Sequence, residues 1–489
     1  MKLLFIILLV LSSCSDEKEV AQVSYKKSVP SLPSTLDPAE MNDTSSLLIS
    51  EMIYDGLLRF DGAKIVSAIA KDWKFSRDNL SITFFIRDGV TFHNGQVVTS
   101  DDVISSLSRY VAHNSKVFNH FDSILAAKEY RRKIAKKVQG LVKIDSSTIQ
   151  IKLNKPDPKI LMSLAGATAK IFPKKELEKK DFFKNPIGSG AYKVKDISEK
   201  KISLVRFDKY YSDLPRHKDF ELIEHDTFEK IEKSLTNKDI IDYSGQIFTG
   251  NEQFDSRFIK KTMTSPETWI IGLNSSIPPF NSMKFRRVFK SLFDSNAFRR
   301  KFHKNSIEAK SYVPPHLLQP ILDSEKIDTN KSVSEHDEFD LFIPKELAQS
   351  AEIAQYLQLK LREVGFKVKV NTLKWHELMK HYDKRSASVL LYSMNVDYPD
   401  AYFMFQGFLI GDKDNFFAAN NKNLHNLITS SKNLKDSNKK MRVYQKISKI
   451  IEDEAFTVNL LHPRHTYYVH KCIKGFKASF MGVVHGLLV

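Results

Sequence analysis

The spacing of hydrophobic residues changes along this chain between the period of a helix and the period of a strand. Side chains from Ser81 to Ile86 alternate as they do in a strand with one buried face. Between 348 and 370 apolar residues first keep helical spacing, and beyond Gly365 they alternate. The helical positions are Ile353, Leu357, Leu361 and Val364, and the alternating ones are Phe366, Val368 and Val370. A helix that ends at Gly365 and a following strand are therefore expected.

Turn and cap signals separate such segments. Asp88-Gly89 and Asn94-Gly95 are pairs typical of tight turns, and Thr99 precedes two acids as the cap of a helix does. Another amphipathic helix is expected over 442–455. Because short strand-like and helical segments alternate without internal repeats or low-complexity tracts, the pattern predicts a mixed α/β protein.

The amino-terminal pattern differs from the rest. Residues 3–11 form an apolar run behind Lys2, too short to span a bilayer and of the length expected in a signal peptide. The run ends in Leu-Ser-Ser-Cys, which resembles a bacterial lipobox, so we expect a signal peptide over 1–13, lipidation of Cys14 and a polar tether over 14–23. The alternative is an ordinary signal peptide in which Cys14 is incidental. No second apolar run reaches spanning length.

Composition narrows the class of protein. The 489 residues suffice for two or three domains, and Cys472 is the only cysteine besides Cys14, so no intramolecular disulfide is expected once Cys14 is lipidated. The formal net charge is +17, from 75 basic and 58 acidic residues. Because the basic residues are scattered and the chain is predicted to be exported, we favour a Lys-rich surface near anionic membrane lipids over nucleic-acid binding.

Four segments together resemble one known family. The strings are LDPAE, YDGLLRFDG and AKDWKFSRDNLSITFFIRDGVTFHNGQVVTSDDV within 36–103, NPIGSGAYKV at 185–194, WIIGLNSSIPPFNSMKFRRVFKSLFD at 269–294, and YSMNVDYPDAYFMF at 392–405. In this order they resemble the extracellular solute-binding proteins of peptide-type ABC transporters, family 5. The glycines of 185–194 are interpreted as turn residues, since neither a phosphate loop nor a nucleophile elbow has this spacing.

The resemblance implies a two-lobed, clamshell fold of the periplasmic-binding-protein class, type II, of the large cluster with an extra subdomain. Lobe I would comprise 24–267 and 465–489, with the extra subdomain at about 59–184, and lobe II would comprise 268–464. The chain would then cross between the lobes twice, and a cleft between them would close on a solute.

The resemblance also implies a ligand site around 392–405. Asp397 matches the carboxylate that peptide binders of the family use to hold the peptide ammonium group, with Met394, Asn395, Val396 and Tyr398 beside it. The alternative is that Asp397 caps the loop before Tyr398-Pro399. Met394 stands where the family usually has tryptophan, so Trp269 is a second candidate for an aromatic wall, or else a core residue. Arg286 and Arg287 are interpreted as structural.

The expected function is that of a binding component. No HExxH, GxSxG or paired-cysteine motif occurs, and His93, His462 and His465 are interpreted as structural, so neither an enzyme nor a metal or cofactor site is expected. The resemblance implies a monomeric lipoprotein of the cell envelope, facing the periplasm or exterior, that passes oligopeptides to an ABC permease and ATPase. The alternatives are a non-peptide solute, such as a nickel chelate, haem or an oligosaccharide, and a sensing or adhesion role.

Overall fold

The computed structural model describes residues 24–471, except 30, 42, 62–63, 114–120, 158, 226–229, 232, 235–241, 243–255, 321–337, 346, 348, 397–399, 413–414, 433 and 435. The predicted signal peptide and tether, Cys14 and Cys472 lie outside this part of the chain.

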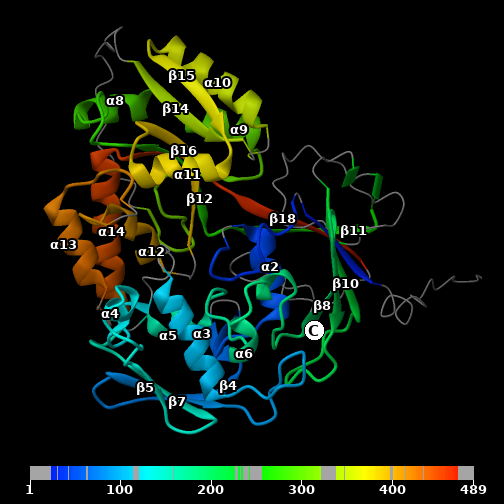
Figure 1. Ribbon diagram of the computed structural model, residues 1–489. Helices are drawn as coiled ribbons and strands as arrows, with labels where there is room; N and C mark the ends of the chain where they lie inside the picture. The colour runs from blue at the N-terminus through cyan, green and yellow to red at the C-terminus, as the bar shows by residue number, and fades with distance from the viewer. Residues whose placement is uncertain are drawn as a thin grey trace, which may run out of the picture.

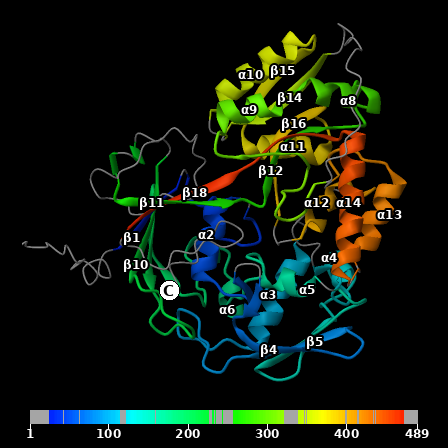
Figure 2. The ribbon, with the colours of Figure 1, turned by 180° about the vertical axis from the view of Figure 1, so that it is seen from behind.

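Two bodies stand one above the other in Figure 1 and again, seen from behind, in Figure 2. We call the described residues of 24–224 the lower body and those of 267–462 the upper body. Each has its own hydrophobic interior. One cluster of buried side chains runs from Tyr25 to Leu222, and two others contain residues from Trp269 to Leu461. The chain therefore folds as a mixed α/β protein with a separate core in each body, and the predicted fold class is confirmed at this level.

The lower body contains three sheets. One has the order β1 (Tyr25–Val29), β10 (Asp219–Glu224), β9 (Lys201–Arg206) and β8 (Tyr192–Ser198). Another has the order β4 (Ala70–Phe75), β5 (Ser81–Ile86), β7 (Thr148–Lys152) and β6 (Leu141–Lys143). The pair β2 (Leu58–Asp61) and β3 (Lys64–Ser67) is the third. The helices are α2 (Thr44–Ile53), α3 (Ser100–Ala112), α4 (Ala127–Arg131), α5 (Ile160–Ala165), α6 (Lys174–Leu177) and the 3-10 turn η2 (Phe182–Lys184).

The upper body is built on one sheet. Its order is β13 (Ile307–Glu308), β17 (Thr457–His462), β12 (Glu267–Leu273), β16 (Val389–Asn395), β14 (Glu338–Pro344) and β15 (Lys367–Leu373). Around it lie α8 (Met283–Leu292), α9 (Ser295–Phe302), α10 (Ser350–Glu363), α11 (Trp375–Lys384), α12 (Tyr402–Phe405), η3 (Gln406–Phe408), α13 (Lys422–Ser431) and α14 (Ser437–Glu454).

Strands carry the chain between the bodies in both directions. β11 (Phe258–Thr264) leads into β12, and β17 leads into β18 (Arg464–His470), which pairs with β11 in antiparallel register. A two-stranded ladder thus adjoins the upper sheet, and in Figure 1 it runs toward the sheet of β1 and β10. The lobe limits given above stay predictions, as do those of the extra subdomain.

Local signals in the sequence predicted several of these elements correctly. The strand expected over 81–86 is β5, and the helix expected over 442–455 is part of α14, which begins earlier, at Ser437, and ends at Glu454. Helix α10 ends at Glu363, and Gly365, with φ 98°, has the left-handed conformation that permits the turn into β15. Asp102 accepts hydrogen bonds from the backbone N–H and the hydroxyl of Thr99, at 2.9 and 2.7 Å, so α3 begins with the expected cap.

The turn interpretation of the glycines at 185–194 is wrong. Neither Gly188 nor Gly190 has a positive φ. A Cβ atom at Gly188 would lie 1.7 Å from the carbonyl oxygen of Ile53, and one at Gly190 would lie 2.5 Å from that of Met52. These glycines are therefore needed because the backbone passes against the end of α2. The His93 ring bridges the same segment, between the Gly188 N–H and the Gly190 carbonyl at 3.2 and 3.0 Å.

Candidate functional site

Strand β16 carries the chain from the core of the upper body to its surface. Its first four side chains are buried, Ser393 and Met394 are half-buried, and Asn395 is exposed. Antiparallel pairing with β12 places Met394 opposite Thr268 and Asn395 opposite Glu267. The segment that follows β16 therefore emerges beside the point where the chain enters the upper body from the lower one.

The predicted ligand residues fall on both sides of this exit. Asp397 and Tyr398 lie outside the described residues. Met394 packs against one core cluster of the upper body, and Val396 is fully buried within that cluster. Among the predicted site residues on this segment that the structure describes, Asn395 has the most exposed side chain. Contacts between a solute and any of these residues stay predictions.

Trp269 lies in the interior of the upper body. Its side chain is 2% exposed, its indole N–H donates to Glu267 Oε1 at 2.7 Å, and its ring meets that of His303 edge-on at 4.5 Å. All of these contacts are with the protein's own core. This placement favours the structural interpretation of Trp269 over the aromatic wall, which stays a prediction.

Asp400 anchors the segment after β16, a role that was not inferred from the sequence. Its carboxylate accepts hydrogen bonds from Tyr444 Oη at 2.6 Å, Lys440 Nζ at 2.7 Å and the Tyr402 backbone N–H at 2.9 Å. Burial alone would raise the pKa of Asp400, but Lys159 and these donors outweigh it and lower that pKa below its usual value. The second acid of the string DYPD thus fixes the returning chain to α14.

Lys159 reaches the same place from the lower body. It precedes α5, which lies just below α12 in Figure 1. Its side-chain nitrogen sits 3.2 Å from the centroid of the Tyr402 ring, and the residue is 7% exposed. Burial lowers the pKa of Lys159 to about 7, with Asp400 acting in the opposite direction and Lys440 adding to the decrease. Lys159 is therefore a buried, electrostatically costly contact between the two bodies.

Hydrogen bonds also order the strands that connect the bodies. Thr268 Oγ1 donates to the Tyr312 carbonyl at 2.9 Å and lies 2.9 Å from His462 Nδ1, and His465 Nε2 lies 2.7 Å from Ser265 Oγ. Burial lowers the pKa of His462 to about 4, so this ring is neutral at physiological pH. Both histidines thus serve as hydrogen-bonding groups of the crossing.

Arg286 is likewise held by the protein. It is buried, and its guanidinium donates to the Glu454 and Phe280 carbonyls at 3.0 and 2.9 Å and pairs with the Glu454 carboxylate at 3.2 Å. The arginine therefore ties α8 to the end of α14, which agrees with its structural interpretation.

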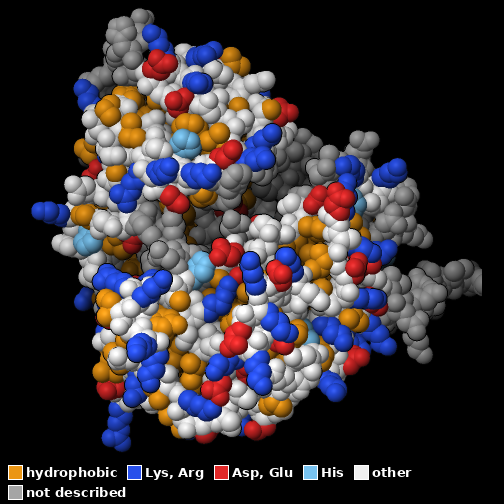
Figure 3. Space-filling view, in the orientation of Figure 1, with side chains coloured by type: hydrophobic (Ala, Val, Ile, Leu, Met, Phe, Trp, Pro, Cys, Tyr) orange, Lys and Arg blue, Asp and Glu red, His pale blue; other side chains and the backbone are white. Residues whose placement is uncertain are grey.

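Together these features describe two bodies with separate cores, joined by the paired strands β11 and β18. Figure 3 shows the surface hollowed between them. Within the described residues no group of three or more His, Cys, Asp or Glu side chains could hold a metal ion. In the same part of the chain, no helix combines the length and apolar character needed to cross a bilayer. Such an arrangement can enclose a molecule between its halves.

Comparison with known families identifies the architecture. The family model of bacterial extracellular solute-binding proteins, family 5 (middle part), matches residues 64–416 of the chain. The chain belongs to this family. The two bodies thus correspond to the two-lobed clamshell fold, and the family comprises solute-binding proteins rather than enzymes.

Individual relatives extend the match to nearly the whole chain. The dipeptide-binding protein of Escherichia coli K12 is 20% identical over 494 residues, covering 88% of each chain. Heme-binding protein A of Haemophilus influenzae is 22% identical over 531 residues, covering 97% of this chain and 95% of that protein. The solved structure of the periplasmic binding protein DppA from Helicobacter pylori, in complex with the peptide STSA, superposes with a TM-score of 0.80 at 18% identity, covering 96% of this chain and 99% of that one.

Proposed function

We propose that the chain is the substrate-binding component of an ABC importer, which captures oligopeptides between its lobes and delivers them to a membrane permease. The observation that carries the proposal is the pair of separate cores linked by crossing strands, with β16 leading a segment out beside the crossing. One relative named for dipeptides and one structural neighbour solved with a bound peptide support peptides as the solute. A separate ATPase would supply the energy, and the peptide would leave chemically unchanged.

Asp397 would hold the peptide ammonium group. A carboxylate in a closing cleft forms charge-assisted hydrogen bonds with an ammonium, and losing one partner of such a buried pair costs ~2–5 kcal/mol. Asp400 is already occupied by Lys440 and Tyr444, which leaves Asp397 as the acid of this segment proposed for a ligand. Its neighbours in the proposed site would be Met394, Asn395, Val396, Tyr398 and Trp269. The side chains of Val396 and Trp269 are buried, so these two would support the site from the core.

Calorimetric titration with free-amine and N-acetylated forms of the same peptides tests this role. Asp397→Asn should weaken binding of free-amine peptides by at least about thirtyfold, the lower end of the cost of an unpaired charge, and affect acetylated peptides far less. Asp196→Asn, on an exposed residue of the lower body, is the matched control. Unchanged affinity for free-amine peptides in Asp397→Asn would remove Asp397 from the site.

The protein would work as a monomer tethered to the membrane. Lipidation of Cys14 after removal of residues 1–13 would leave residues 14–23 as a tether in the cell envelope, with the folded part facing the periplasm or exterior. Metabolic labelling with a fatty-acid analogue tests the anchor, since wild type should carry label and Cys14→Ser should not. Equal labelling of the two chains would contradict it.

A non-peptide solute is the second candidate. Met394 in place of an aromatic residue and the similarity to a heme-binding protein over 97% of this chain favour it. Mass spectrometry of the small molecules that co-purify with the full chain separates the two candidates, because each class of solute has its own mass and fragmentation. A sensing or adhesion role would show as binding without import in cells that contain the permease.

A further inference from the structure

A loop of the lower body concentrates positive charge far beyond the average of the chain. Residues 128–143 contain seven Lys or Arg and a single acid, Glu129. The segment comprises α4, the turn at 132–137 and β6, and both α4 and β6 contact α3. We call residues 131–137 the basic loop.

Some of these charges hold the loop in place, and others are exposed. Arg131 pairs with Asp122 at 2.7 Å and donates to the Val111 carbonyl at 2.9 Å, which fixes the start of the loop against the end of α3. Lys143 pairs with Asp101 at 2.5 Å. The exposed side chains are Arg132, Lys133, Lys136 and Lys137, and these four form no ion pair within the part of the chain that the structure describes.

An apolar side chain stands in the middle of these charges. Ile134 is 72% exposed, the highest exposed fraction among the large hydrophobic residues that the structure describes. The backbone turns sharply here, because the N–H groups of Ile134 and Ala135 both donate to the Glu129 carbonyl, at 2.8 and 3.2 Å. The turn therefore presents Ile134 to solvent, between Lys133 on one side and Ala135 and Lys136 on the other.

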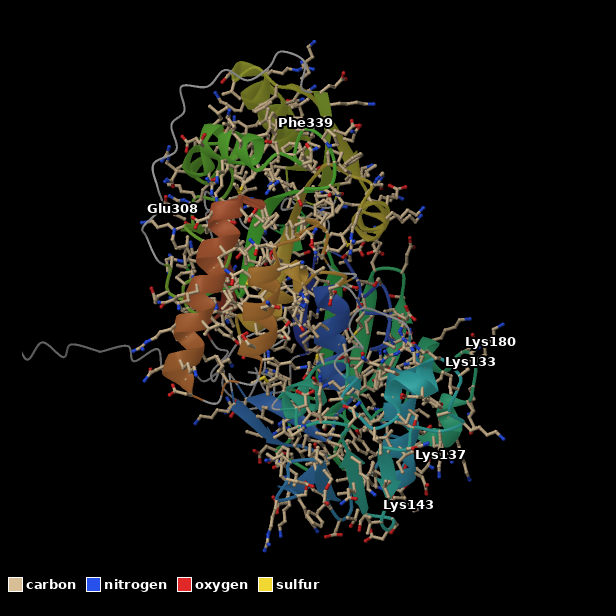
Figure 4. All side chains as sticks on the ribbon, turned by 90° about the vertical axis from the view of Figure 1, so that its left-hand side faces the viewer. Lys133, Lys137, Lys143, Lys180, Glu308 and Phe339 are labelled. Atoms are coloured by element: carbon tan, nitrogen blue, oxygen red, sulfur yellow. The ribbon has the colours of Figure 1, made fainter. Side chains whose placement is uncertain are left out.

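The charged face continues onto neighbouring elements. Figure 4 shows Lys133, Lys137, Lys143 and Lys180 along one side of the lower body. Lys180 follows α6, which also packs against α3, and its side chain is exposed. This face therefore carries exposed cations together with one exposed apolar side chain, Ile134.

We propose that the basic loop rests on an anionic phospholipid surface, with Ile134 entering the headgroup region and Arg132, Lys133, Lys136 and Lys137 facing lipid phosphates. Lipid surfaces attract basic residues through their negative potential, and an apolar side chain among the cations adds burial that a soluble acidic partner would not require. The face would orient the lower body toward the membrane. This contact is separate from solute binding, so its test does not depend on the ligand.

Sedimentation with vesicles measures the contact. The full chain should bind vesicles of mixed phosphatidylglycerol and phosphatidylcholine more tightly than vesicles of phosphatidylcholine alone, and the difference should shrink as salt is raised. Each basic residue near such a surface contributes about fivefold to binding, so the triple variant Arg132→Gln, Lys133→Gln, Lys137→Gln should lose at least about tenfold on the anionic vesicles. Ile134→Ser should lose several-fold on them and keep the salt dependence of wild type.

The matched control removes three exposed lysines from the upper body, Lys367→Gln, Lys369→Gln and Lys380→Gln, for the same change in net charge. All chains are produced in the same way and have the same amino-terminal segment, so any binding through that segment is common to all of them. The proposal is overturned if wild type shows no preference for anionic vesicles, or if the control loses as much binding as the triple variant. It is also overturned if Ile134→Ser binds as wild type does, because the loop would then not enter the lipid surface.

Discussion

Replacing Lys159 with methionine should favour the form in which the two bodies touch. The substitution keeps an unbranched side chain beside Tyr402 and removes the charge. In the structure burial lowers the pKa of Lys159 from 10.5 to about 7, which corresponds to about 5 kcal/mol against the charged form. The attraction between a desolvated cation and an aromatic ring stabilises the charged form by about 2 kcal/mol. The cost of burying the charge therefore exceeds the gain from the Tyr402 ring. Lys159→Met should stabilise the contact between the two bodies by about 3 kcal/mol.

The pH dependence has a definite sign. When the bodies separate, Lys159 reaches water and regains a pKa near its ordinary value. Between about pH 7 and 10 the separated form therefore binds more protons than the form in contact, so closure releases a proton and becomes more favourable as the pH rises. Wild type should close progressively over this window, whereas Lys159→Met should show no such dependence from this site.

Small-angle X-ray scattering and amide hydrogen exchange of α5 and α12 follow the equilibrium without a solute. At neutral pH, Lys159→Met should have a smaller radius of gyration and slower exchange in both helices than wild type. Lys155→Met, on an exposed neighbour in the same segment, is the control and should match wild type. A more open Lys159→Met variant would refute the reasoning, because it would mean that the cation–ring and Asp400 attractions exceed the cost of burial.

Three further substitutions test the packing of the bodies by chemical denaturation. Gly188→Ala should lower the free energy of unfolding by about 3 kcal/mol, because its Cβ would overlap the Ile53 carbonyl. The control Gly166→Ala, where the nearest atom lies 3.4 Å away, should lower it far less. Equal losses in the two variants would contradict the close-approach explanation. Asp102→Ala should lower the free energy of unfolding by at least about 2 kcal/mol, since it removes the acceptor of the Thr99 and Lys174 backbone N–H groups. The control Asp101→Ala, at the adjacent position, should leave the free energy of unfolding nearly unchanged. Burial lowers the pKa of His303 to about 4, so the free energy of unfolding decreases as the pH falls from 6.5 toward 4. In His303→Phe this decrease should be smaller by about 3 kcal/mol, because phenylalanine does not titrate. An unchanged pH profile in the variant would show that His303 does not titrate as inferred.

Features that depend on residues close together in the sequence could be predicted from the sequence. Thr99 and Asp102 are three positions apart, so their cap is visible in the string itself, and Gly365 marks the change of period where α10 ends. The motifs that resemble family 5 can be read directly from the sequence, which is why the two-lobed fold could be expected.

Features that depend on contacts between distant segments could not be predicted. Nothing near Lys159 indicates that it meets Tyr402 and Asp400, because that contact arises only when the two bodies come together. Gly188 was interpreted as a turn residue for the same reason, since the carbonyl that excludes a side chain belongs to α2. Burial of Trp269 against His303 likewise depends on how α9 packs on the sheet.

The central claim is that the lobes close around a solute and release it unaltered. Scattering of the full chain, first stripped of co-purified molecules by mild denaturation and refolding and then titrated with those same molecules, tests it most directly. The account predicts a saturable decrease in the radius of gyration, with the solute recovered at its original mass. A radius of gyration unchanged at every concentration, or a solute recovered at a different mass, would contradict it.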